Sequence, residues 1–192
     1  MLDKSVPFVD VFMHRKKGAA VPVYNLPAGY GYSYFRPGDE KSWAKIETSV
    51  LEFPDELDAL IYFQKAFLPF ITELEKRCLF IENDKGEKIA TSTAWWGYTG
   101  VRRDPWLHWV AVKPQYQGLG LGKAIISKIT QTMVEIEGDR DFYLHTQTWS
   151  HKAIKLYQKI GYEITSEKYL DKYTNDNYER AMAVLKTIAN SG

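Results

Sequence analysis

The chain has 192 residues, 45% of them hydrophobic, with 25 Lys and Arg against 24 Asp and Glu. This length suits one hydrophobic core, and the near-neutral balance argues against a broad electrostatic surface for nucleic acid. Cys78 is the single cysteine, which excludes an internal disulfide. No apolar run approaches membrane-spanning length, and charged residues interrupt the N-terminus. We therefore expect a cytoplasmic protein with no nucleic-acid or membrane partner.

The first third of the chain alternates apolar stretches with turn signals. Residues 1–28 predict an N-terminal extension, either a hairpin added to a sheet edge or an arm packed on the domain at 29–189. The aromatic run after Gly29 predicts a strand, and residues 40–50 predict a helix. A second helical pattern over 55–77 should kink or split at Pro69.

Short strands follow on both sides of a longer central one. Residues 79–82 and 89–96 predict a hairpin, and 141–148 a further strand. Residues 106–112 read Trp-Leu-His-Trp-Val-Ala-Val, apolar on both alternating faces except at His108. Such a run is typical of a central strand covered on both sides. Two more strands are predicted near the C-terminus, over 164–169 and 178–185.

A glycine loop links the central strand to a helix. Gly118, Gly120 and Gly122 follow Pro114, which should end the strand, and an apolar helical stripe runs from Lys123 to a stop at Gly138. The start of a helix has unpaired N–H groups and the positive end of the macrodipole, so this unit suits a phosphate or pyrophosphate.

Two common phosphate loops do not fit these residues. A dinucleotide fingerprint needs its third glycine or alanine where Lys123 or Ile125 stands. A nucleoside-triphosphate loop needs glycine at Gln117 and Ser or Thr at Ala124.

The pattern that does fit is Gln-x-x-Gly-x-Gly at Gln117, Gly120 and Gly122, after a strand ending Val-Ala-Val-x-Pro. A second motif at 150–162 reads Ser-His-Lys-Ala-Ile-Lys-Leu-Tyr-Gln-Lys-Ile-Gly-Tyr. With these two motifs in this order, the chain resembles the GNAT superfamily of N-acetyltransferases. Ser150 stands where the superfamily usually has Asn; either residue can cap a helix, although a side-chain contact to the cofactor is put in doubt.

The resemblance implies an α/β fold with a mixed central sheet, a splayed parallel strand pair and flanking helices. It also implies acetyl-coenzyme A as co-substrate and no metal. The pyrophosphate would lie on the glycine loop, and the pantetheine arm would enter the strand gap. The residues that the resemblance assigns to this binding are Val110, Ala111, Val112, Gln117, Gly118, Leu119, Gly120, Leu121, Gly122, Lys123 and Ser150.

Catalytic roles are also expected from the resemblance. Tyr157 would be the general acid that protonates the departing thiolate, although it also lies on an apolar helix stripe and can be read as core. His108 would be the base, on the premise that it shares a strand face with Val110 and Val112; a hydrogen-bonded core histidine is the alternative. Other residues left open for the acceptor side are His145, Gln147, Glu47, Arg102, Arg103 and the tryptophans around the cleft.

These observations predict an N-acetyltransferase that moves an acetyl group to a primary amine of a small molecule by direct attack. Two alternatives remain: transfer to a peptide or protein amino group, and a coenzyme A-binding module without turnover. A homodimer is left open.

Overall fold

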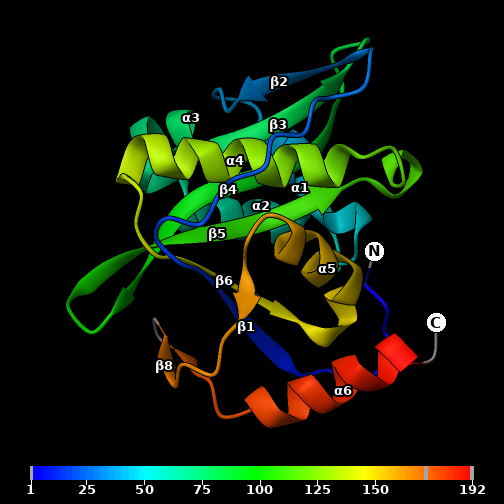
Figure 1. Ribbon diagram of the computed structural model, residues 1–192. Helices are drawn as coiled ribbons and strands as arrows, with labels where there is room; N and C mark the ends of the chain where they lie inside the picture. Colours follow the sequence, from blue (N-terminus) through cyan, green and yellow to red (C-terminus); the bar gives the residue numbers. More distant parts are fainter. Residues whose placement is uncertain (1, 171–172, 191–192) are drawn as a thin grey trace.

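The computed structural model describes residues 2–170 and 173–190. Its main sheet has seven strands in the order β2-β3-β4-β5-β6-β1-β7, with helices on both faces (Figure 1). The strands of this sheet are β1 (Asp10–Arg15), β2 (Tyr30–Tyr34), β3 (Cys78–Asn83), β4 (Lys88–Thr99), β5 (Arg102–Val112), β6 (Phe142–Gln147) and β7 (Glu163–Ile164). The α-helices are α1 (Glu40–Ser49), α2 (Glu56–Ala66), α3 (Ile71–Arg77), α4 (Leu121–Glu137), α5 (His151–Lys159) and α6 (Tyr178–Asn190).

Each face of the sheet has its own core. On one face, α4 and α5 pack their apolar residues against Leu79, Leu107 and Leu144. On the other, α1 and α2 pack an aromatic cluster around Trp43, which is fully buried. Cys78 is also fully buried there, and burial raises the pKa of its thiol to about 12. Pro69 splits the predicted second helix into α2 and α3, joined by a 3-10 turn at Leu68–Phe70.

The strands β5 and β6 form the splayed parallel pair. They pair only at Trp106 with Tyr143 and at Leu107 with Leu144, although β5 continues to Val112 and β6 to Gln147. The backbone of β5 after Leu107 therefore has no ladder partner on the β6 side among the described residues. This confirms the predicted mixed α/β fold with its open strand pair.

A β-bulge interrupts β5 where the two strands separate. Thr93 pairs with His108 and Thr91 with Ala111, so two residues of β5 stand opposite one residue of β4. Trp109 has a φ of 51°, a left-handed conformation that costs a non-glycine residue about 1–3 kcal/mol. The extra residue reverses the alternation of side chains. His108 and Val110 consequently lie on opposite faces, and the premise that they share one is wrong.

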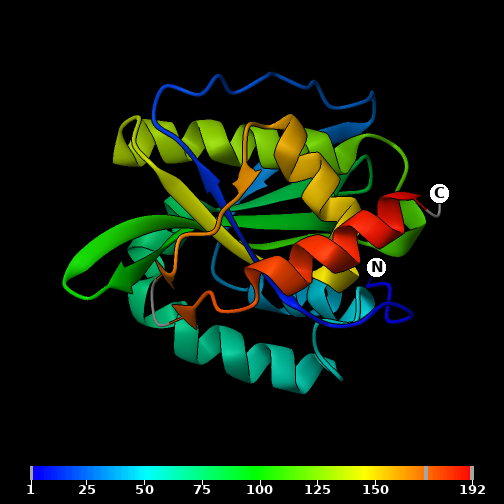
Figure 2. The same cartoon turned by 60° about the horizontal axis from the view of Figure 1, so that its bottom comes forward.

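The N-terminal segment contributes a strand, β1, to the interior of the main sheet. β1 pairs with β6 on one side and β7 on the other (Figure 2). The connection from β1 to β2 runs over α4, where Ser127 donates a hydrogen bond to the carbonyl of Pro22 at 2.6 Å. The segment is thus neither an edge hairpin nor a surface arm, because its strand lies inside the sheet.

The predictions of two C-terminal strands, over 164–169 and 178–185, were wrong for most of these residues. Residues 178–185 lie in α6, with Ala181 buried and Val184 and Leu185 packed on the core at helical spacing. Of residues 164–169, only Ile164 and Tyr169 are in strands; β8 (Tyr169–Leu170) pairs with β9 (Tyr173–Thr174). Within the described ranges, no helix is both long and apolar enough to cross a membrane.

Candidate active site

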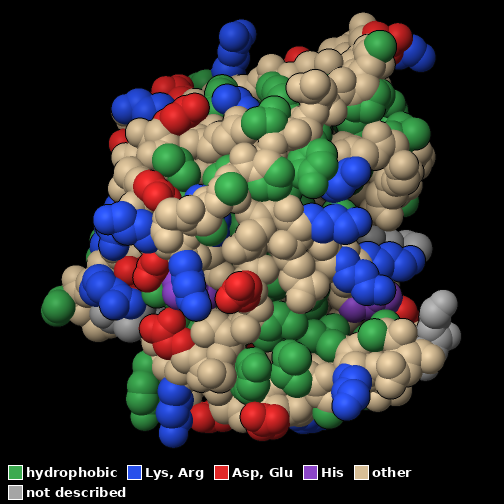
Figure 3. Space-filling view, viewed as in Figure 1, with side chains coloured by type: hydrophobic (Ala, Val, Ile, Leu, Met, Phe, Trp, Pro, Cys, Tyr) green, Lys and Arg blue, Asp and Glu red, His purple; other side chains and the backbone are tan. Residues whose placement is uncertain are grey.

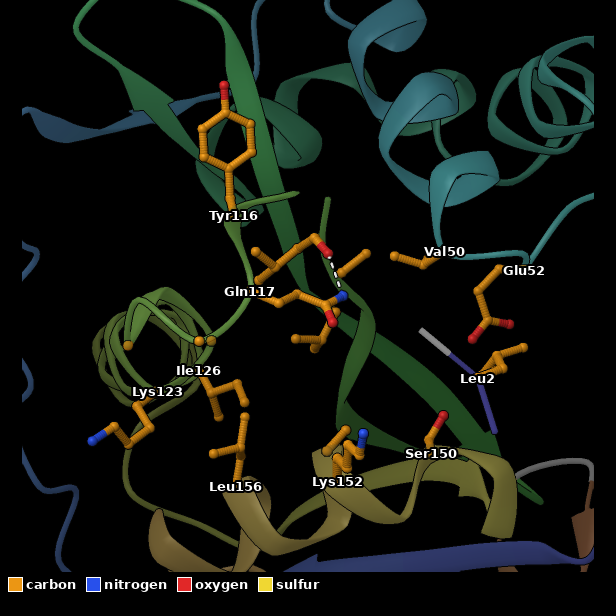
Figure 4. Close-up of a pocket in the computed structure, with 17 residues that line it drawn as sticks. Leu2, Val50, Glu52, Tyr116, Gln117, Lys123, Ile126, Ser150, Lys152 and Leu156 are labelled. Atoms are coloured by element: carbon orange, nitrogen blue, oxygen red, sulfur yellow. Dashed lines mark hydrogen bonds between the residues drawn. The ribbon is translucent and has the colours of Figure 1, made fainter. Parts of the chain in front are cut away.

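A pocket of about 430 Å³ lies where the glycine loop, the open side of β5 and the start of α5 meet (Figure 4). It contains every residue that the sequence assigned to the cofactor except Leu119 and Leu121, whose side chains are exposed and buried in the core respectively. Eight further residues line it: Leu2, Val50, Glu52, Tyr116, Ile126, Lys152, Ala153 and Leu156.

The glycine loop presents backbone amides to this pocket. Gly118 and Gly120 both have a φ of 84°, and a Cβ added at either would meet open space. Glycine is needed there for the backbone conformation. Ala124 is the first residue of α4 whose amide reaches the preceding turn, donating to Gly120 O at 3.2 Å. The helical amides before Ala124 have no helical partner, so they can donate hydrogen bonds to a phosphate. The Gln117 amide already donates to Pro114 O, so the cradle starts at Gly118.

Gly122 serves a different purpose. A Cβ at this position would lie 3.1 Å from Leu156 Cδ1, closer than carbon atoms normally pack. The absence of a side chain lets α4 approach α5. Glycine at this position therefore keeps the two helices that form the pocket walls close together.

The open strand forms the pocket floor. Val110, Ala111 and Val112 line it, and the Gln117 side chain crosses to donate a hydrogen bond to Val112 O at 2.8 Å (Figure 4). Trp109 holds the bulge in place from the other face, because its indole packs on Phe53 and Tyr62 at 5.2 and 4.9 Å. Its Nε1 also donates to Tyr62 Oη at 3.2 Å.

Basic side chains gather over α5 and the start of α4 (Figure 3). Lys152 lines the pocket, whereas Lys123 points outward and lies 5.0 Å from the ring of Tyr24 (Figure 4). Ser150 occupies the N-cap position of α5, but its side chain makes no capping bond and faces the pocket instead. The surroundings suit an anionic ligand.

Tyr157 lies on the inner side of α5, with 6% of its surface exposed. Burial raises the pKa of its hydroxyl, and the charges of Glu52, Tyr162 and Glu47 raise it further. Its hydroxyl thus stays protonated at physiological pH, and Tyr157 lies behind the pocket lining rather than in it. The predicted alternative of a core aromatic also holds, because the ring packs in the same core as α4.

Glu52 is a pocket residue that the sequence analysis did not identify. It follows Leu51, whose φ of 70° turns the chain sharply at the end of α1. Figure 4 places Glu52 and Leu2 across the pocket from Lys123 and Ile126. Burial raises the pKa of Glu52, while a hydrogen bond from Gln147 and the charge of Lys4 act to lower it. The sequence carries no clear signal for this turn, because a residue at positive φ is usually glycine or asparagine and here it is Leu51.

Glu47 is buried rather than solvated. Its surface is 1% exposed, and its Oε1 has no hydrogen-bond partner within the described ranges. Burial raises the pKa of Glu47 well above its ordinary value, and the charge of Glu52 adds to the rise. Two carboxyl groups therefore converge at the end of α1.

The other sequence candidates are placed as follows. His108 lies on the α1 face of β5, outside the pocket lining, with its ring centroid 6.4 Å from that of Trp106. Gln147 donates a hydrogen bond to Glu52. Arg102 and Arg103 make ion pairs with Asp104 and Glu137, both at 2.9 Å, so they have structural partners. Four of the candidate tryptophans pack in aromatic clusters, namely Trp95, Trp96, Trp106 and Trp109. Trp149 instead packs against Phe8, with ring centroids 5.0 Å apart.

Residues 2–9, here called the strap, close one side of the pocket. They dock on the turn before α5 through Asp3 N to Trp149 O and Trp149 Nε1 to Val6 O, at 2.9 and 2.8 Å. Asp3 Oδ2 also lies 3.1 Å from His151 Nε2. The strap brings Leu2 into the pocket beside Glu52.

Residues 40–162 match the profile of the Acetyltransferase (GNAT) family. The chain belongs to this family. Among curated relatives, it is 35% identical over 63 residues to thialysine N-epsilon-acetyltransferase of Sus scrofa, covering 33% of this chain and 36% of the relative. It is 32% identical over 74 residues to N-alpha-acetyltransferase of Sulfurisphaera tokodaii, covering 35% and 44%. The match spans less than half of each relative's length.

Solved structures of GNAT proteins share the fold. A GCN5-related N-acetyltransferase from Sphaerobacter thermophilus superposes with a TM-score of 0.65 and 18% identity, over 83% of this chain and 49% of that one. Glucosamine-6-phosphate N-acetyltransferase from Arabidopsis thaliana gives 0.53 and 16%, over 75% and 97%. At these identities the likeness establishes the fold alone.

Proposed function

We propose that this GNAT protein transfers an acetyl group from acetyl-coenzyme A to a primary amine of a small molecule by direct attack. One observation supports this most strongly. A single pocket joins the unpaired amides of the glycine loop to the open strand β5, and ends at Glu52. It thus combines an anion cradle with a carboxylate that can receive an ammonium ion.

The chain's residues fit the co-substrate. The amides of Gly118 to Lys123 would hold the diphosphate, with Lys152 supplying positive charge from the opposite wall. The free edge of β5 at Val110 and Val112 would pair with the amide-containing arm. Acetyl-coenzyme A supplies the activated thioester.

Glu52 is the base that we favour for the acceptor amine. An alkylamine with a pKa of ~10.4 is neutral in only about one molecule in 2,500 at pH 7, so its proton must be removed. A carboxylate whose pKa is raised by burial is a stronger base than an ordinary one. Glu52 first attracts the ammonium form and then accepts its proton.

His108 remains the second candidate for this role. It lies on the face where α1 ends, so it can approach the acceptor from the side of β5. An imidazole titrates near pH 6.5 without perturbation. The pH dependence of variants separates the two, as described in the Discussion.

Val110 and Tyr157 would act on the other two reacting atoms. The amide of Val110, directed by the bulge, would donate to the acetyl oxygen as negative charge develops. The buried hydroxyl of Tyr157 keeps its proton and would donate it to the departing sulfur. The acceptor nitrogen loses two protons: Glu52 would take the first before attack and release it to solvent, and the second, lost from the tetrahedral adduct, would restore the proton that Tyr157 gives to the sulfur.

The strap favours a small acceptor over a peptide. A peptide needs an open groove beside the acyl group, and Leu2 covers that side of the pocket next to Glu52. The name of the pig relative refers to a small amine, and that of the archaeal relative to an α-amino group. Both describe transfer to amines, so they support the reaction and leave the choice of acceptor to the pocket.

Free-thiol release from acetyl-coenzyme A with a panel of amines tests this function. The panel contains amino acids, polyamines, aminoglycosides, arylalkylamines and peptides with free N-termini. We expect turnover with small amines and little with peptides. Binding of acetyl-coenzyme A without release by any amine would contradict the proposal and favour a non-catalytic module.

A further inference from the structure

A pair of polar side chains on β1 and β6 lies next to the Glu52 end of the pocket. Asp10 stands opposite Gln147 in the β1–β6 ladder, and Phe12 stands opposite His145. Directly opposed residues share a face, with Cβ atoms about 5 Å apart. Because Gln147 also bonds to Glu52, it connects Asp10 to the acceptor end.

The Asp10 carboxylate is fixed in place and open to a ligand. Its Oδ1 lies 2.8 Å from His145 Nε2, and its side chain is 38% exposed. The His145 ring is held between Phe12 and Tyr173, at centroid distances of 4.7 and 4.5 Å. The Asp10 carboxylate can accept a charged hydrogen bond from an ammonium group, beside a histidine that the two rings hold in place.

Two carboxylates of this region can receive positive charge. They belong to Asp10 and Glu52, because burial favours the neutral form of Glu47 by raising its pKa. Lys4 is the nearby cation whose charge reaches Glu52, and its Nζ lies over the Trp149 ring at 5.3 Å. Asp10 and Glu52 therefore offer one position each for an ammonium group.

We propose that the acceptor is a short diamine or polyamine: one nitrogen lies beside Glu52 and is acetylated, and the Asp10 carboxylate holds the second ammonium. This inference rests on the proposed function and specifies its substrate class. Gln147, between the two carboxylates, would contact the methylene chain. A monoamine of the same length would leave the Asp10 position unfilled.

Matched amines test the second cation. The rate of thiol release is measured for 1,4-diaminobutane and 1,5-diaminopentane against butylamine and pentylamine. A charged hydrogen bond gained by the diamine predicts a kcat/KM about 10- to 100-fold higher than for the monoamine. Asp10→Asn should abolish this preference by lowering kcat/KM for diamines only. Asp10→Glu should keep it and shift the optimum toward the shorter diamine, since its carboxylate reaches further.

Asp141→Asn is the control. Asp141 pairs with His14 at 3.5 Å at the far end of the same two strands, so its loss should leave the diamine preference unchanged. Equal use of monoamines and diamines, or equal loss of both in Asp10→Asn, overturns the inference while leaving acetyl transfer intact.

A binding measurement separates the two proposals. Calorimetry of 1,4-diaminobutane into protein saturated with coenzyme A needs no turnover. Binding that Asp10→Asn abolishes supports the second-cation site even if no amine is acetylated, in which case the proposed reaction fails alone. Absence of binding to the wild-type protein overturns the site.

Discussion

The backbone amide of Glu52 donates a hydrogen bond to the carbonyl of Glu47 at 3.2 Å, so the end of α1 fixes two acidic residues at one place. One carboxyl group is buried in the aromatic core, and the other faces the pocket. The turn that separates them passes through Leu51 in a left-handed conformation. Such strained geometry is often retained at sites where function requires a particular placement.

Replacing Glu47 by Gln should stabilise the protein at high pH. The pKa of Glu47 is raised in the folded state, so its stabilising effect is present below the ordinary glutamate pKa and lost as pH rises toward the folded value. Calorimetric melting should give Glu47→Gln a higher Tm than wild type at pH 8, by several degrees, with the difference vanishing near pH 4. Glu75→Gln on the exposed side of α3 is the control and should show no such trend. A lower Tm for Glu47→Gln at pH 8 would mean that the carboxylate is charged and paired.

Replacing Glu52 by Gln should remove the base. We expect kcat/KM to fall by about 10²- to 10⁴-fold. In the wild type, the rate should rise with pH through a pKa above the ordinary glutamate value, because burial raises it. This rise should flatten in Glu52→Gln and persist in His108→Asn. If the rise with pH is instead lost in His108→Asn and persists in Glu52→Gln, the base is His108 on β5.

Replacing Gly120 by Glu should weaken acetyl-coenzyme A binding, since it places an anion in the cradle. Gly138 offers a matched control, because it also has a positive φ and open surroundings, at the other end of α4. Both substitutions strain the backbone, and Gly138→Glu does so more because a ψ of 166° at positive φ is a conformation that essentially only glycine adopts. Only Gly120→Glu should raise the Kd, by at least about tenfold for the loss of one charged contact. Similar Kd values for the two variants would show that the loop does not bind the phosphates.

Replacing Tyr157 by Phe should lower kcat and leave the Kd for acetyl-coenzyme A nearly unchanged. Tyr162→Phe is the control: its ring is also buried, 6.3 Å from that of Tyr157, and its hydroxyl contacts Met133 Sδ at 4.0 Å. We expect a fall in kcat of about 10²-fold or more for Tyr157→Phe alone. If both variants keep wild-type rates across the pH range, the acid is another group.

Local patterns predicted the strand, glycine loop and helix because each depends on residues close together in the chain. The same holds for the split at Pro69, whereas the open parallel pair was implied by the resemblance to the GNAT superfamily. The glycines served two purposes that the sequence could not separate: Gly118 and Gly120 allow a backbone conformation, whereas Gly122 permits contact with Leu156.

Long-range relationships were missed. The bulge at Trp109 reversed the side-chain alternation, so a period of two placed His108 on the wrong face relative to Val110. Residues 178–185 carry an apolar pattern that suits either a strand or a helix, and packing against β1 decides for the helix. Glu52 entered the site only through tertiary structure, since its partners Gln147 and Lys4 are distant in sequence.

The central claim is that amides of Gly118 to Lys123 bind the diphosphate while Val110 and Tyr157 lie beside the thioester. An NMR titration of the isotopically labelled protein with coenzyme A observes these amides directly. The account predicts that the largest amide shifts occur at Gly118 to Lys123 and at Val110, with smaller ones along α5. Saturable binding that leaves those amides unshifted, or no shift anywhere at millimolar coenzyme A, would contradict it.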